Sequence, residues 1–249
     1  MSTWILLRGL VREAGHWGGF PELLAAELPE ARVIALDLPG NGTANAHHSP
    51  VSIEAMARHC RGELERQGVP PPYHLLAMSM GGMVAAAWAD AHPEEISACV
   101  LLNTSFGAFS PLHHRLRPGA WPRLLKVLLE SSDRGREALI FDLTSSLARE
   151  THPKVIEHWA ALRIAHPVQL GNAVRQLMAS ACFRAPRQAS VPTLLLLGAG
   201  DQLVDPRCSQ EIAQRWACPL EVHPWAGHDL TLDDPAWVAA EVHAWLGYR

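Results

Sequence analysis

The residue best placed to do chemistry is a serine that stands where an apolar segment ends. Residues 73–78 form a run typical of a strand, Ser79 follows, and Gly81 opens a segment of small residues. Small-x-Ser-x-Gly, with Ala77 at the first position, is the pattern of a nucleophile elbow, a strained strand-to-helix turn that lifts the serine Oγ clear of the sheet. An ordinary turn has the same local pattern, so the assignment depends on partners elsewhere in the chain.

A serine nucleophile needs a general base and a third group that orients that base. Residues 191–198 are an apolar run of strand length, and Asp201 follows closely at its C-terminal end. His228 lies in a loop after the short strand predicted at residues 220–223. The order Ser79, Asp201, His228 predicts a catalytic triad in which His228 moves the proton and Asp201 orients His228.

Two other carboxylates compete for the acid position. Asp205 also follows the strand of residues 191–198, but Pro206 beside it favours a role in capping the next helix. Asp229 is adjacent to His228 and should point elsewhere. We therefore predict Asp201 as the acid.

Attack on a carbonyl also requires donors for the developing oxyanion. The pattern predicts two backbone N–H groups, one from the residue after the nucleophile and one from the loop after the first strand. With residues 3–7 as that strand, the predicted donors are the amides of Met80 and Leu10.

The elements that must position these groups alternate along the chain. Apolar runs and amphipathic stripes follow one another, which predicts an α/β fold with a mostly parallel central sheet flanked by helices. This rhythm stops after residue 106, and residues 107–186 read as consecutive helices. We therefore predict a core domain of residues 1–106 and 187–249 and a helical insertion of residues 107–186.

With these motifs in order, the chain resembles the α/β-hydrolases over nearly its full length. Among capped members it is most similar to the pimeloyl-acyl-carrier-protein methyl ester carboxylesterase group, because the spacing from Arg8-Gly9 to Trp17 matches their oxyanion loop and first helix. Those relatives usually carry His where Arg8 stands. The resemblance implies that residues 107–186 form a lid and that Ser79 cleaves a carboxylic ester through an acyl-serine intermediate, which water then hydrolyses.

Two other functions on the same fold remain open. The menaquinone-pathway lyases have a similar length and lid, but usually carry a basic residue after the elbow glycines, where this chain has Met83. A ligand-binding receptor or scaffold would keep the fold without needing an intact triad. Haloalkane dehalogenase and epoxide hydrolase chemistry is disfavoured, since those relatives need Asp where Ser79 stands.

No cofactor or metal is expected. Residues 40–42 do not make a dinucleotide fingerprint, and Gly81-Gly82 lacks the Lys-Ser/Thr of a phosphate-binding loop. There is no Cys-x-x-Cys, and the paired histidines lack the spacing of metal ligands.

Charge is divided unevenly along the chain. Residues 107–186 hold 11 Lys or Arg and 6 Asp or Glu, a net charge of +5, whereas the remainder holds 10 and 19, a net charge of −9. The insertion either exposes arginines to water or attracts an anionic acyl group or an acidic carrier protein that presents a small-molecule ester. Nucleic acid is not an expected partner, because the chain as a whole is acidic.

No membrane partner is expected either. Residues 67–89 carry no formal charge, but prolines, Ser79 and two glycines interrupt them, which favours a strand, an elbow and a helix over a span. The N-terminus lacks the pattern of a signal peptide, and five widely spaced cysteines are typical of reduced thiols. We expect a cytoplasmic protein.

Arg8 ends the first strand, where a free guanidinium would be costly to bury. We predict a carboxylate partner, with Asp37 the first candidate because it follows the next strand in sequence, and Glu13 the second. A bidentate pair would tie the loop that contains Leu10 to the sheet.

Overall fold

Six parallel strands form one sheet in the order β2-β1-β3-β4-β5-β6 in the computed structural model, which describes residues 2–247. Every neighbouring pair is parallel. The strands are β1 (Ser2–Leu7), β2 (Ala31–Leu36), β3 (Tyr73–Met78), β4 (Ile96–Leu102), β5 (Thr193–Gly198) and β6 (Leu220–His223). The predicted α/β fold with a parallel central sheet is confirmed.

Helices cover both faces of the sheet, which explains why the central strands are almost continuous apolar runs. Alternate side chains of β1 enter opposite cores: Ile5 packs in one cluster with α2, α3 and α9, and Trp4 packs in the other with α1 and α11. These helices are α1 (Phe20–Glu27), α2 (Ile53–Arg66), α3 (Met80–Ala91), α9 (Arg207–Trp216) and α11 (Pro235–Gly247), and short turns are η1 (Ala14–Trp17), η2 (Gly42–Ala44), η3 (Pro93–Glu95) and α10 (Leu230–Asp233).

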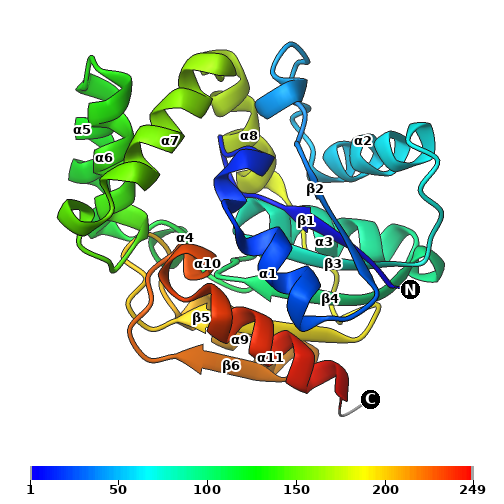
Figure 1. The fold of residues 1–249 in the computed structure, drawn as a ribbon. Helices are drawn as coiled ribbons and strands as arrows, with labels where there is room; N and C mark the ends of the chain where they lie inside the picture. Colours follow the sequence, from blue (N-terminus) through cyan, green and yellow to red (C-terminus); the bar gives the residue numbers. More distant parts are fainter. Residues whose placement is uncertain (1, 248–249) are drawn as a thin grey trace.

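The segment between β4 and β5 contains helices only, as the sequence predicts for residues 107–186. It comprises α4 (Leu112–Arg115), η4 (Pro118–Ala120), α5 (Trp121–Leu129), α6 (Asp133–Thr144), η5 (Arg149–Thr151), α7 (Pro153–Ala165) and α8 (Leu170–Cys182). Figure 1 shows α5 to α8 gathered on one side of the sheet. We refer to residues 107–186 as the insertion.

The charge-free residues 67–89 divide into the end of a loop, β3 and α3, in agreement with the sequence-based interpretation. Among residues 2–247, no helix combines the length and the apolar character that crossing a membrane would need. All five cysteines are free thiols.

Candidate active site

Ser79 occupies a strained turn between β3 and α3. Its backbone angles are φ 55° and ψ −120°, in the left-handed half of the map that a residue with a Cβ rarely adopts. Gly81 is required here, since a Cβ on it would lie 2.4 Å from the backbone oxygen of Leu7. The predicted elbow geometry is therefore present, and the half-exposed Ser79 stands at its apex.

Asp201 and His228 meet at the C-terminal end of the sheet. His228 Nδ1 lies 2.7 Å from Asp201 Oδ2, and both side chains are buried. The other carboxylate oxygen accepts the amides of Leu203 and Val204 at 2.8 and 2.9 Å, which fixes the carboxylate plane. The predicted contact between Asp201 and His228 is confirmed, and it leaves His228 Nε2 free to face Ser79, a contact that stays a prediction.

Asp205 has a different role, as the sequence indicates. It forms a bidentate pair with Arg207, at 3.0 and 2.7 Å, and accepts the Arg207 amide at the start of α9. The hydrogen bonds from Arg207 lower the pKa of Asp205 to about 2. Asp205 therefore does not compete with Asp201 for the histidine.

The two predicted oxyanion donors come from elements next to the nucleophile, α3 and the loop after β1. Met80 is the first residue of α3, so its amide belongs to the first helical turn, which has no intrahelical acceptor. Within residues 2–247, the Leu10 amide donates no hydrogen bond. A Cβ added to Gly9, the residue before Leu10, would lie 3.0 Å from the Ser79 Cβ, so the loop after β1 approaches the serine closely. Assignment of these two amides as the oxyanion hole stays a proposal.

Asn103, immediately after β4, is a positioning residue that the sequence analysis missed. Its Nδ2 donates to the backbone oxygens of Gly227 and His228 at 3.0 and 2.8 Å, and its Oδ1 accepts the Gly198 amide at 2.9 Å. One buried side chain thus ties the end of β5, which precedes Asp201, to the loop of His228. A signal was available, since Asn103 is the first polar residue after an apolar strand and such positions meet at one edge of a parallel sheet.

Thr104 supports the elbow in the same way. Its hydroxyl donates to the backbone oxygen of Ser79 at 2.7 Å. A Cβ on Gly82 would lie 2.7 Å from that hydroxyl oxygen, so the second elbow glycine makes room for this hydrogen bond.

Asn103→Ala should destabilise the fold and lower the rate together. The change leaves two carbonyls and one amide without their partner, and each buried group left unsatisfied costs about 1 to 3 kcal/mol. Thermal unfolding and kcat measured on the same preparation would show both effects. Gln188→Ala, at an exposed amide side chain, is the matched control and should change neither. If the Asn103→Ala protein were as stable as the parent, Asn103 would not hold the end of β5 and the His228 loop together.

The predicted partners of Arg8 are wrong. Arg8 instead pairs with Asp229: Nη1 lies 3.1 Å from Oδ1 and Nη2 lies 2.6 Å from Oδ2, with both side chains almost fully buried. The guanidinium also lies over the Trp17 ring, 4.8 Å from its centroid. The expectation of a bidentate carboxylate partner is confirmed, but the residue that supplies it is the neighbour of His228.

Asp37 and Glu13 are occupied elsewhere, which explains the correction. Asp37 accepts the amides of Ala14 and Thr43 and the Thr43 hydroxyl, at 2.7 to 2.9 Å. Glu13 faces His166 of the insertion at 3.1 Å. Burial of Asp229 opposes ionisation, but the charge and hydrogen bonds of Arg8 outweigh it and hold the pKa of Asp229 below its ordinary value.

The insertion is attached directly to the loops around Ser79. Gln176 of α8 accepts the Val11 amide at 2.9 Å, next to Leu10. Arg12 reaches Glu137 of α6 at 2.6 Å. Arg117 donates to the backbone oxygen of Asp201 at 2.6 Å. These contacts attach the insertion to the loops that carry Leu10 and Asp201, and its role as a lid stays a prediction.

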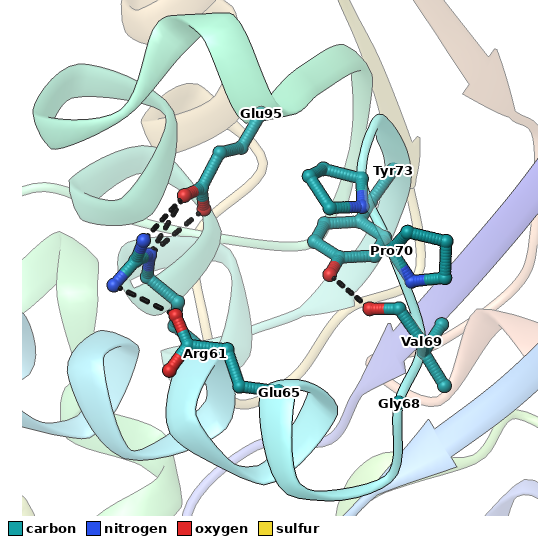
Figure 2. A pocket seen from close by; sticks show the side chains of 8 residues that line it. Arg61, Glu65, Gly68, Val69, Pro70, Tyr73 and Glu95 are labelled. Carbon is teal, nitrogen blue, oxygen red and sulfur yellow. Dashed lines mark hydrogen bonds and ion pairs between the residues drawn. The ribbon is translucent and has the colours of Figure 1, made fainter.

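A hollow of about 380 Å³ lies at the other end of the sheet, at the start of β3. Figure 2 shows that its polar groups pair among themselves: Arg61 with Glu95 and Glu65, and the Tyr73 hydroxyl with the backbone oxygen of Val69. Its lining contains no serine, cysteine or histidine, so it is distinct from the site at Ser79.

The fold and the relatives of this chain support a hydrolase as its general class. The chain belongs to the alpha/beta hydrolase fold family, whose model matches residues 5–235. It is 25% identical to monoacylglycerol lipase abhd6-B of Xenopus laevis, over 93% of this chain and 71% of that protein. It is also 25% identical to the 2-succinyl-6-hydroxy-2,4-cyclohexadiene-1-carboxylate synthase of Serratia proteamaculans, over 98% of this chain and 92% of that protein.

Solved structures show the same fold. A thermophilic esterase from Thermogutta terrifontis aligns with a TM-score of 0.74 at 24% identity, covering 100% of this chain and 90% of that one. The enol-lactonase from Burkholderia xenovorans LB400 aligns with a TM-score of 0.79 at 19% identity, covering 99% of this chain and 91% of that one. The lipase among the curated relatives supports ester hydrolysis as the general class of activity, whereas these solved structures show the fold alone.

Proposed function

We propose that this protein hydrolyses a carboxylic ester through an acyl-serine intermediate. The observation that carries the proposal is the buried 2.7 Å contact between Asp201 and His228, at the strand ends where the elbow presents Ser79. A hydroxyl in that setting becomes a nucleophile when the neighbouring imidazole accepts its proton.

The proposed reaction proceeds in two halves. Ser79 Oγ attacks the ester carbonyl while His228 Nε2 takes the hydroxyl proton, and the Leu10 and Met80 amides stabilise the oxyanion. The intermediate collapses, His228 returns the proton to the departing alkoxide, and the acyl group remains on Ser79. In the second half His228 takes a proton from a water molecule, which attacks the acyl-serine carbonyl. The acyl–Oγ bond then breaks, His228 returns the proton to Ser79 Oγ, and the acid leaves. Asp201 stabilises the imidazolium in both halves.

The substrate proposal is an ester whose acyl part is anionic or linked to a carrier. It rests on the resemblance to the pimeloyl-acyl-carrier-protein methyl esterases and on the net positive charge of the insertion. A lyase reaction of the menaquinone-pathway type is a second candidate, favoured by similarity to the Serratia synthase over nearly the whole length of both chains. The buried, uncharged Met83 after the elbow glycines disfavours it. A binding protein that keeps the fold would show neither activity.

Trapping the acyl-enzyme tests this proposal. The protein is mixed with p-nitrophenyl esters of increasing acyl length and quenched in acid within the first turnover, and the intact mass is measured. We expect a burst of p-nitrophenol and a mass increase equal to one acyl group, mapped by digestion to Ser79. Release of p-nitrophenol without a covalent adduct at any acyl length would overturn the acyl-serine mechanism, and no release would favour a lyase or a binding protein.

A further inference from the structure

Apolar side chains on the surface concentrate in the insertion. Among residues 2–247, ten of the thirteen large hydrophobic side chains that are strongly exposed belong to it, and only Val51, Val222 and Trp225 lie elsewhere. Eight of the ten form two sets, on α5 and on α8, and each set is between 47% and 76% exposed. Exposed apolar surface gathered in one part of a molecule marks an interaction site more often than scattered single residues do.

The exposed side chains of α5 form one face of an amphipathic helix. Trp121, Leu125, Leu128 and Leu129 follow the spacing four, three, one, which places them on one side of the helix. No residue of α5 is buried, and Figure 1 shows the helix at the outer edge of the insertion, beyond α6. The apolar face of α5 therefore has no partner within the described chain.

Helix α8 repeats this arrangement. Its exposed side chains are Leu170, Val174, Leu177 and Met178, at the same spacing as on α5. Its buried face is polar instead: Asn172 accepts the Ser49 amide and Gln176 donates to Asn41 Oδ1. A helix that buries amides and exposes an apolar face is the reverse of a helix packed to fill a core.

Both helices are attached to loops of the candidate site. Arg117, four residues before α5, donates to the backbone oxygen of Asp201, and its own amide donates to Leu203. Gln176 of α8 accepts the Val11 amide, one residue beyond Leu10. The segments that hold the two helices are thus tied to the loops that carry Asp201 and Leu10.

Unpaired positive charges accompany the apolar faces. Arg123 and Lys126 on α5, Arg134 on α6 and Arg175 on α8 are exposed, and none has a carboxylate partner among residues 2–247. Four of the six acidic side chains of the insertion are already in ion pairs, namely Asp133, Glu137, Asp142 and Glu150. Glu130 at the end of α5 is in no ion pair within the described chain, so the unpaired charge beside the apolar faces is mainly positive.

We propose that these faces of α5 and α8 bind the surface of an anionic lipid aggregate and hold the site of Ser79 against it. Leucines and a tryptophan on one side of a helix, with Lys and Arg beside them, suit the boundary between lipid headgroups and acyl chains. The cations add attraction to an anionic surface within about a Debye length. The proposed attachment is peripheral and departs from the sequence-based expectation of no membrane partner, which stays a prediction.

Sedimentation with lipid vesicles tests the proposal without catalysis. The probes are vesicles of phosphatidylcholine alone and of phosphatidylcholine and phosphatidylglycerol in equal parts. The unsubstituted protein should sediment with the anionic vesicles and less with the neutral ones. Ser79→Ala should bind equally well, so failure of the proposed hydrolysis would leave this result unchanged.

Two pairs of variants separate the apolar and cationic contributions. Leu125→Gln with Leu128→Gln should weaken binding to anionic vesicles at least about tenfold. Arg123→Gln with Lys126→Gln should weaken it about tenfold and reduce the preference for anionic lipid. The matched controls are Val222→Gln and Arg58→Gln, at exposed positions outside the insertion, and both should bind as the parent does.

Three outcomes would overturn the proposal. One is no sedimentation of the parent protein with anionic vesicles. Another is loss of vesicle binding in Arg123→Gln with Lys126→Gln but not in Leu125→Gln with Leu128→Gln. That result would indicate a purely electrostatic surface suited to an acidic protein. The third is a higher KM for soluble long-chain esters in the leucine variant with unchanged vesicle binding, which would assign the face to the acyl pocket.

Discussion

Ser79→Ala should lower ester turnover by roughly four to six orders of magnitude, the effect that loss of a nucleophile has when the triad acts as one unit. His228→Ala should lower ester turnover by about the same factor, because either change alone removes the covalent route. The double variant should therefore be little slower than either single variant. Steady-state kinetics on a p-nitrophenyl ester and thermal unfolding of each variant would measure rate and stability separately.

The stability of these variants distinguishes a chemical role from a structural one. Ser79→Ala keeps the strained backbone and should unfold near the temperature of the parent. Ser79→Gly should be inactive yet more stable, since glycine adopts φ 55° without the cost of about 1 to 3 kcal/mol that such a conformation carries for other residues. Ser131→Ala, at an exposed serine of the insertion, is the matched control. An unchanged rate in Ser79→Ala would remove Ser79 from the mechanism.

Asp229→Ala should destabilise the protein by about 3 to 5 kcal/mol, the cost of leaving a buried charge unpaired. Arg8 would keep its burial and its position over Trp17 but lose both hydrogen bonds to the carboxylate. Denaturant unfolding of the variant and the parent gives this difference directly. Asp142→Asn, which breaks an exposed pair with Arg149, is the matched control and should cost no more than about 1 kcal/mol.

Kinetics of a variant at Arg8 test whether the Arg8–Asp229 pair positions the loops of the candidate site. Arg8→Lys retains the charge but cannot form the planar bidentate contact, so the loops that contain Leu10 and His228 should lose their common anchor. We expect a lower kcat with little change in KM. If both kcat and thermal stability are unchanged in Arg8→Lys, the pair does not position these loops.

The contribution of this pair to stability should depend on pH. Because the pKa of Asp229 is lower in the folded protein than in the unfolded chain, ionised Asp229 stabilises the fold above about pH 4, its ordinary titration range. That stability is lost as the pH falls through the folded pKa. The difference in unfolding free energy between the parent and Asp229→Ala should therefore shrink below pH 4 and stay constant between pH 6 and 8.

The elbow, the contact between Asp201 and His228 and the alternation that builds a parallel sheet were predictable from the sequence. These features are local or periodic: Ser79 follows β3 directly, Asp201 stands three residues after the end of β5, and parallel strands bring their C-terminal ends to one edge. The helical insertion was also predictable, because the apolar spacing changes between β4 and β5.

Which other polar groups meet at that edge depends on how the loops pack in the folded chain. Arg8 and Asp229 are 221 residues apart, and nothing in the spacing of either predicts the other. The strand order β2-β1-β3-β4-β5-β6 and the course of the loops bring them together, while Asp37, nearer in sequence, is occupied by Ala14 and Thr43. A buried charge takes the partner that the folded loops bring within reach, and that distance is fixed by packing rather than by position along the chain.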